Sequence, residues 1–157
     1  MLDVIIPGLG DYHFEHLVLD VNGTLALDGV LLDGVLERLT AIRAALQLHL
    51  VTADTHGRLS SISQLLGITG TRLRPTESES EQKTAYVRTL GSRSVVAIGN
   101  GANDVGMLGE AGLGIVVLGP EGTAVDALKS ADIAASSITQ ALDLLLFPKR
   151  LVATLRR

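Results

Sequence analysis

The sequence predicts an α/β fold in which helices cover both faces of a doubly wound parallel sheet. Short apolar segments of strand length alternate with segments whose apolar residues recur at helical spacing. Hydrophobic residues make up 46% of the 157 residues but aromatic residues only 3%, so the core must consist mainly of Leu, Val, Ile and Ala. A chain of this length is expected to form a single domain over residues 1–157.

Charge and hydropathy exclude two classes of partner. The formal net charge is −4 and no basic cluster is longer than Arg156–Arg157, so we expect no nucleic acid to bind. No apolar run reaches ~18 residues and no basic leader precedes one, which predicts a soluble, cytoplasmic protein without a membrane segment.

The absence of cysteine excludes disulfides and thiolate metal sites. A mean hydropathy of +0.37 favours a buried subunit interface, and thus a homo-oligomer.

The first two elements are predicted to be strands. Residues 2–6 form the first, and a glycine-containing turn after Pro7 leads into a second strand over residues 12–19. The resulting hairpin is expected to add an antiparallel edge strand to the sheet. His13 and His16 are three residues apart in an alternating strand and therefore face opposite sides, so we expect no shared metal site there.

A flap and a helix follow. Two Asp-Gly steps lie between apolar residues within 25–34, and this pattern predicts a small hairpin that projects beside Asp20. Apolar residues then recur at helical spacing from Val35 to Leu46, and Asp33 is a candidate N-cap for this helix.

The remaining segments continue the alternation of strands and helices. Gly67 is the expected C-cap of its helix. Lys83 is placed in the first turn of a helix, where a cation opposes the helix dipole, and this unfavourable placement invites a functional explanation. We predict strands over residues 48–51, 69–73, 94–98, 112–118 and 132–134. We predict helices over residues 58–66, about 83–90, from about 102 onward, 124–129, 137–146 and 151–155. Pro148 separates the last two helices.

Polar residues follow several of the predicted strands. Ligands bind beyond the carboxyl ends of the strands in an open α/β sheet. A carboxylate nucleophile, a hydroxyl group, an ammonium group and a metal-binding carboxylate that meet there would suit phosphoryl transfer through an aspartyl-phosphate. The residues that supply these groups are Asp20 with Asn22 and Thr24, then Thr52, then Lys83, and finally Asn103 with Asp104.

The order and spacing of these residues resemble the four motifs of the haloacid dehalogenase superfamily, over residues 16 to about 135. The stretch Asn-Gly-Ala-Asn-Asp-Val-Gly-Met-Leu, residues 100–108, further resembles small soluble proteins related to the phosphorylation domain of P-type ATPases. This resemblance implies a Rossmann-like, haloacid dehalogenase-like sheet and a phosphatase that uses Mg²⁺ and acts on a phosphorylated substrate.

The resemblance also implies a role for each residue of the motifs. Asp20 would attack phosphorus, and Asn103 would orient the phosphate or Lys83. Asp104 would bind the metal directly or through water. The implied catalytic residues are Asp20, Asn22, Thr52 and Lys83. The implied phosphate-binding residues are Gly23, Thr24, Thr52, Ala53, Lys83 and Asn103. The implied Mg²⁺ ligands are Asp20, the Asn22 carbonyl, Asn100 and Asp104.

Two residues depart from the superfamily pattern. Asn22 stands where its phosphatases carry an aspartate that serves as general acid and base, a role worth about 10²- to 10⁴-fold in rate. P-type ATPases also lack this carboxylate and have long-lived phosphoenzymes, so hydrolysis is expected to be slow. Asn100 stands where the pattern has a metal-binding aspartate, and an amide brings no charge to Mg²⁺. These amides leave open an alternative: a catalytically impaired regulatory protein that binds phosphate and Mg²⁺, or a structural protein on the same fold.

The intervals between the motifs bear on the substrate. Residues 25–51 and 53–82 are too short to contain a substantial cap domain, so the site is expected to be open. Open members of the superfamily act on large substrates or are covered by a neighbouring subunit. Residues 54–56 and the flap at 28–29 are expected to line the entrance, and His56 is a weaker candidate for a replacement general base.

Overall fold

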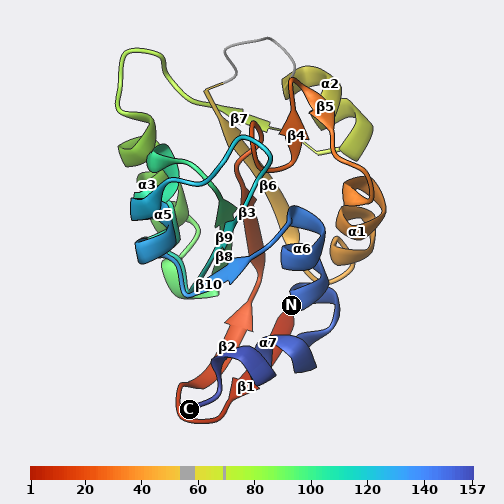
Figure 1. The fold of residues 1–157 in the computed structure, drawn as a ribbon, viewed down its shortest axis with the longest axis vertical. Coiled ribbons are helices and arrows are strands. Elements are labelled where there is room, and N and C mark those ends of the chain that lie inside the picture. The colour runs from red at the N-terminus through yellow and green to blue at the C-terminus, as the bar shows by residue number, and fades with distance from the viewer. Residues whose placement is uncertain (54–58, 69) are drawn as a thin grey trace.

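The computed structural model describes residues 1–53, 59–68 and 70–157. A six-stranded sheet lies at its centre, in the order β10-β9-β8-β3-β6-β7, and every neighbouring pair of strands is parallel. The predicted parallel α/β fold is therefore confirmed (Figure 1). The strands are β3 (His16–Leu19), β6 (Gln47–Thr52), β7 (Gly70–Arg72), β8 (Val95–Gly99), β9 (Leu113–Val117) and β10 (Ile133–Ala135).

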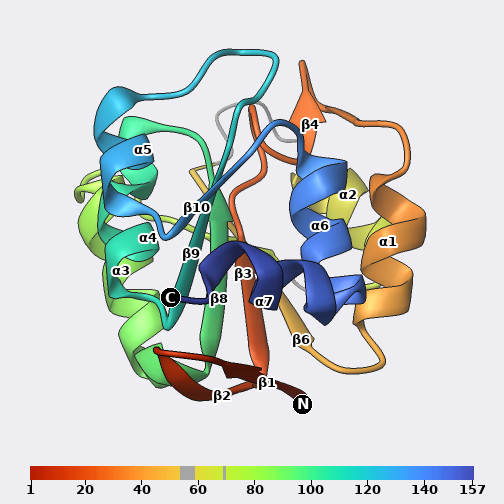
Figure 2. The same ribbon diagram turned by 60° about the horizontal axis from the view of Figure 1, so that its bottom comes forward.

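Helices cover both faces of the sheet, as Figure 2 shows. One face carries α1 (Val35–Ile42), α2 (Leu59–Leu66) and α6 (Ile138–Leu146), and the other carries α3 (Glu79–Thr89), α4 (Val105–Glu110) and α5 (Val125–Ser130). Leu17 and Leu19 belong to the core on the first face, whereas Val18 belongs to the core on the second. Successive strand side chains point to opposite faces, so a strand covered on both faces must be apolar throughout. Among the described residues, no helix combines the length and hydrophobicity needed to cross a membrane.

The N-terminal hairpin forms, but not where the sequence places it. Strands β1 (Leu2–Ile6) and β2 (Gly10–Phe14) pair in an antiparallel two-stranded sheet of their own. The expectation that they add an edge strand to the main sheet is wrong, because the chain continues at Glu15 into β3, which is already flanked by β6 and β8. The hairpin instead packs against the C-terminal helix α7 (Pro148–Leu155) (Figure 1).

The flap is confirmed as a hairpin of β4 (Ala26–Leu27) and β5 (Val30–Leu31). Its two turn residues, Asp28 and Gly29, have φ angles of 50° and 77°, as expected of the left-handed turn that Asp-Gly favours between antiparallel strands. Gly67 follows α2 with a φ of 63° and ends that helix as predicted.

Three helix boundaries differ from the predictions. Asp33 does not cap α1, because Gly34 with a φ of 77° stands between it and the helix and no side chain caps this end. Lys83 lies one turn beyond the start of α3, whose N-cap Ser78 accepts a hydrogen bond from the Glu81 N–H. Helix α7 begins at Pro148, because proline is well suited to the first helical position. Two 3₁₀ helices, η1 (Ser92–Ser94) and η2 (Ala102–Asp104), flank β8.

Candidate active site

Lys83 joins two carboxylates at the carboxyl edge of the sheet. Asp20 directly follows β3, Asp104 ends η2 after β8, and Lys83 comes from α3. The Lys83 Nζ lies 2.6 Å from Asp20 Oδ1 and 2.6 Å from Asp104 Oδ1. The Lys83 side chain is fully buried, whereas most lysines are solvated at the surface. Three motifs that are distant in the sequence therefore form one charged cluster.

The Asp104 carboxylate is held in place by backbone groups. Its Oδ2 accepts hydrogen bonds from the N–H groups of Asn100 and Gly101, both at 2.9 Å. A Cβ on Gly99 would lie 2.5 Å from the Asp104 carboxyl group. Glycine is therefore required at position 99, because any side chain would displace this carboxylate.

Thr24 and Asn100 continue the cluster on the other side of Asp20. The Thr24 hydroxyl lies 3.1 Å from Asp20 Oδ2 and 3.0 Å from Asn100 Oδ1. The Asn100 Nδ2 donates to the Gly122 carbonyl at 3.0 Å. This bond fixes the orientation of the amide, so its oxygen faces Thr24 and Asp20 and is a candidate ligand for a cation.

The loop after Asp20 leaves its backbone groups available for a ligand. Gly23 donates to the Ala26 carbonyl, and Ala26 donates to the Val21 carbonyl, so the loop is tightly closed around Asn22. Neither the N–H nor the carbonyl of Asn22 bonds another backbone group in the described part of the chain. A free N–H can face an anion and a free carbonyl can bind a cation.

Burial and like charge perturb the acidity of Asp20. Burial and the neighbouring Asp104 carboxylate raise the pKa of Asp20 from 3.8 to about 6, although Lys83 and Thr24 lower it in part. Burial alone would lower the pKa of Lys83, but the two carboxylates raise it above its usual value. Asp20 is therefore mainly ionised at pH 7, and Lys83 stays charged.

Asp20→Asn is expected to stabilise the metal-free protein at pH 8. Because the pKa of Asp20 is about 6 in the fold, the native state holds a proton that the unfolded state releases from about pH 3.8 upward, and stability falls as the pH rises through this window. An amide does not ionise and escapes this loss, which amounts to about 1–3 kcal/mol. Thermal unfolding should show a higher Tm for the variant at pH 8 and a much smaller difference at pH 4. Equal differences at both pH values would contradict the electrostatic explanation.

The remaining predicted residues lie at the same edge. Thr52, the last residue of β6, is buried, and Ala53 follows it. Asn103 makes no hydrogen bond with Lys83. Its Nδ2 donates to Glu79 Oε2 at 2.7 Å, a partner that the motif pattern does not indicate. The entrance residues Asp54, Thr55 and His56 lie outside the described residues, so their expected roles stay predictions.

The donor set of the cluster fits a hard divalent cation. The carboxylate of Asp20, the carbonyl of Asn22 and the amide oxygen of Asn100 are oxygen donors of the kind such ions prefer. Asp104 Oδ1 already accepts from Lys83, and its Oδ2 accepts two N–H groups, so Asp104 has little capacity for direct ligation. In the described residues, no group of three or more His, Cys, Asp or Glu side chains forms a metal site. Amide and backbone oxygens would therefore have to complete the coordination.

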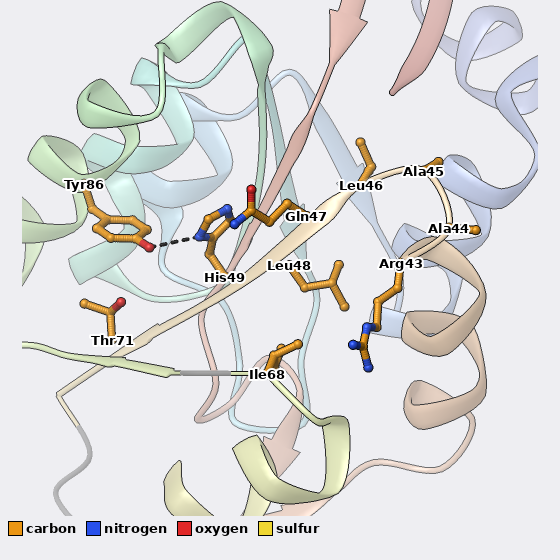
Figure 3. Close-up of a pocket in the computed structure, with 10 residues that line it drawn as sticks. All are labelled: Arg43, Ala44, Ala45, Leu46, Gln47, Leu48, His49, Ile68, Thr71 and Tyr86. Carbon is orange, nitrogen blue, oxygen red and sulfur yellow. Dashed lines mark hydrogen bonds between the residues drawn. The ribbon is translucent and has the colours of Figure 1, made fainter.

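A separate groove of about 660 Å³ lies near the start of β6, away from the charged cluster. Figure 3 shows His49 and Tyr86 meeting across it, with the His49 Nδ1 2.9 Å from the Tyr86 hydroxyl. The His49 Nε2 also lies 3.1 Å from His16 Nδ1. Burial and the neighbouring His16 ring lower the pKa of His49 to about 4. His16 therefore pairs with His49, whereas His13 pairs with Asp3.

Sequence similarity links parts of the chain to three known proteins. Uncharacterized protein MJ0073 of Methanocaldococcus jannaschii is 48% identical over 65 residues, which cover 41% of this chain and 70% of that protein. Uncharacterized protein MJ0072 of the same organism is 44% identical over 39 residues, which cover 25% of this chain and 89% of that protein. Probable phospholipid-transporting ATPase 12 of Arabidopsis thaliana is 49% identical over 51 residues, or 32% of this chain, but this match spans only 4% of the ATPase. No protein-family model matches the chain.

Several solved structures with a similar fold are phosphatases. The cobalt-bound deoxy-D-mannose-octulosonate 8-phosphate phosphatase of Haemophilus influenzae has a TM-score of 0.71 at 12% identity, with 88% of this chain and 90% of that chain covered. The 3-deoxy-D-manno-octulosonate 8-phosphate phosphatase of Moraxella catarrhalis, with magnesium, phosphate and KDO, has a TM-score of 0.65 at 20% identity and coverages of 90% and 93%. A phospho-aspartyl intermediate analogue of phosphoserine phosphatase has a TM-score of 0.64 at 14% identity and coverages of 87% and 99%. The chain thus has the fold of the haloacid dehalogenase superfamily and belongs to the same family as MJ0073 and MJ0072 of M. jannaschii.

Proposed function

We propose that this protein is a Mg²⁺-dependent phosphohydrolase or phosphotransferase that works through an aspartyl-phosphate on Asp20. The buried contact of Lys83 with both Asp20 and Asp104 is the observation that carries the proposal. An ammonium group at this place neutralises the carboxylates and is available to the oxygens of an incoming phosphoryl group. The fold likeness to magnesium- and phosphate-bound phosphatases supports the same reading.

The chain's own groups would bind and orient the phosphoryl group. Lys83 and Thr24 lie on opposite sides of the Asp20 carboxylate, and the Asn22 N–H is free to face an anion. We assign further phosphate contacts to Gly23, Thr52, Ala53 and Asn103. Mg²⁺, held by Asp20, the Asn22 carbonyl and the Asn100 amide oxygen, would offset the negative charge of the phosphoryl oxygens and lower the barrier to attack by a carboxylate.

The proposed reaction has two steps. One oxygen of Asp20 attacks phosphorus, the bond between phosphorus and the leaving oxygen breaks, and the released alcohol takes a proton from water. Water, or another acceptor hydroxyl, then attacks the aspartyl-phosphate and gives up its proton to solvent, while the bond between phosphorus and Asp20 breaks; this frees the Asp20 carboxylate and yields phosphate or a new phosphate ester. Asn22 can neither give the first proton nor take the second, so both steps are slow.

Hydrolysis of 4-nitrophenyl phosphate, measured with and without Mg²⁺, tests this proposal. We expect slow, Mg²⁺-dependent turnover that is lost in Asp20→Asn, together with an acid-stable, hydroxylamine-sensitive phosphoenzyme in the wild-type protein. Turnover that persists in Asp20→Asn would contradict an aspartyl-phosphate on this residue. A variant of the surface carboxylate Asp126, Asp126→Asn, serves as a control and should keep wild-type turnover.

The amides at Asn22 and Asn100 favour a second candidate function, a regulatory or structural protein that retains the site without turnover. Beryllium fluoride, which mimics a phosphoryl group on a carboxylate, distinguishes this second candidate function from the enzyme. Protection from thermal unfolding by beryllium fluoride and Mg²⁺, without any turnover or phosphoenzyme, would favour a binding protein. A protein that shows neither turnover nor protection would be left with a structural role.

A further inference from the structure

A turn on the far side of Asn100 brings an additional carboxylate to the site. Residues 119–122 form a narrow turn in which the Gly122 N–H donates to the Gly119 carbonyl at 3.0 Å. The turn is fixed to Asn100 by two bonds: Asn100 Nδ2 donates to the Gly122 carbonyl at 3.0 Å, and the Asn100 carbonyl accepts from Ala124 at 2.9 Å. The position of Glu121 is therefore coupled to that of Asn100.

Close backbone packing places Glu121 over the loop that follows Asp20. A Cβ on Gly119 would lie 2.4 Å from the Gly23 carbonyl oxygen, so the turn rests directly on this loop. A Cβ on Gly23 would lie 2.6 Å from Glu121 Oε2, 2.9 Å from Asn100 Nδ2 and 3.2 Å from Asn100 Oδ1. The Glu121 carboxylate and the Asn100 amide thus adjoin the same point above Gly23, next to Asn22.

Glu121 has no structural role that would explain this position. It makes no hydrogen bond or ion pair with any residue that the structure describes, and its side chain is exposed. Exposed carboxylates are ordinarily solvated, but this one lies against the backbone of the loop that follows Asp20. The charges of the residues around Asp20 indicate what this carboxylate does.

The charged residues of the cluster do not balance the charge of a divalent cation. Asp20 and Asp104 carry two negative charges and Lys83 one positive charge, so a single negative charge faces a doubly charged cation. Asn22 and Asn100 contribute oxygen donors but no charge. Glu121 is the carboxylate that the turn adds beside both amides.

We infer that Glu121 supplies the negative charge that the amides lack, by accepting a hydrogen bond from a water molecule on the bound Mg²⁺. Mg²⁺ loses its waters reluctantly and usually keeps several of them in protein sites, so a carboxylate can act on it without direct contact. Partners of this kind typically change metal affinity by about 10- to 100-fold. This inference rests on the proposed function, because it assumes Mg²⁺ at the Asp20 site.

Calorimetric titration of the full chain with Mg²⁺ tests the inference without any measure of activity. Glu121→Gln is expected to weaken Mg²⁺ binding by about 10- to 100-fold. The control Asp126→Asn removes the same charge from the adjoining helix, where the side chain is 78% exposed, and should change Kd less than twofold. Unchanged affinity in Glu121→Gln, or equal weakening in both variants, would overturn the inference.

A second variant tests whether Glu121 compensates for Asn100. In an Asn100→Asp background the missing charge is restored, so adding Glu121→Gln should weaken Mg²⁺ binding much less than it does in the wild type. An equal loss of Mg²⁺ affinity in the wild-type and Asn100→Asp backgrounds would show that Glu121 does not compensate for Asn100. These outcomes are distinct from failure of the proposed function: wild-type protein that binds no Mg²⁺ overturns both, whereas tight wild-type binding with no effect of Glu121→Gln overturns only this inference.

Discussion

Asn22→Asp is expected to accelerate breakdown of the phosphoenzyme by about 10²- to 10⁴-fold, the usual contribution of a general acid or base. The new carboxylate would stand two residues after Asp20, on a loop whose closure by Gly23, Ala26 and Val21 fixes its geometry. The Asn22 side chain makes no hydrogen bond with the described residues, so its replacement breaks no hydrogen bond among them. We therefore expect Asn22→Asp to fold like the wild type, so that the added carboxylate changes the rate of breakdown.

Single-turnover decay of the phosphoenzyme in wild type and in Asn22→Asp measures this effect directly. Asn22→Ala is the matched control, because it removes the amide without adding an acid, and it should decay at the wild-type rate or more slowly. An Asn22→Asp phosphoenzyme that decays no faster than wild type would show that the missing carboxylate does not limit hydrolysis. The amide at Asn100, which brings no charge to the proposed Mg²⁺, would then be the candidate cause of slow hydrolysis.

The sequence predicted the sheet because its strands are buried on both faces. Runs such as Val95–Gly99 and Leu113–Val117 are entirely buried, and continuous apolar runs of this length leave few alternatives to a parallel sheet between helices. The flap was predictable for a local reason, since Asp28 and Gly29 favour the turn conformation that the structure shows.

The N-terminal hairpin was placed wrongly because local pattern does not report strand order. Residues 12–19 look like one strand, yet the chain passes at Glu15 from a separate hairpin into the centre of the sheet. Glu15 already pairs on both sides, donating to Ser94 and accepting from Gln47. Only the positions of β6 and β8, which are set by tertiary packing, exclude the hairpin from this sheet.

The two carboxylates of the charged cluster were predictable from their places after strands, whereas Lys83 was assigned to the cluster through the resemblance of its motif. Asp20 and Asp104 follow strands, so their meeting at one edge follows from the topology. Lys83 projects from a helix, and its complete burial depends on α3 packing over both carboxylates. Glu79 and Glu121 could not be identified from the sequence, because each reaches the site through a tertiary contact, one with Asn103 and one over Gly23.

Lys83→Met is expected to destabilise the protein by about 3–5 kcal/mol and to abolish turnover. Methionine has a similar volume but leaves Asp20 and Asp104 buried without a counterion, and an uncompensated buried charge costs this much. For a chain of this size the loss corresponds to roughly 10 °C or more in Tm. The loss should be larger at pH 8 than at pH 4, because protonation of Asp20, whose pKa is already raised to about 6, relieves the repulsion.

Thermal unfolding of Lys83→Met alongside Lys129→Met measures the effect against a matched control. Lys129 pairs with Asp126 at 3.7 Å on the surface, with its side chain 73% exposed, and its replacement should cost no more than about 1 kcal/mol. Should Lys83→Met fail to fold, the double variant Lys83→Met with Asp20→Asn provides the decisive comparison. Removing one of the two charges left without a counterion should restore part of the stability, although not turnover. A double variant no more stable than Lys83→Met alone would show that Lys83 holds the fold by packing rather than by its charge.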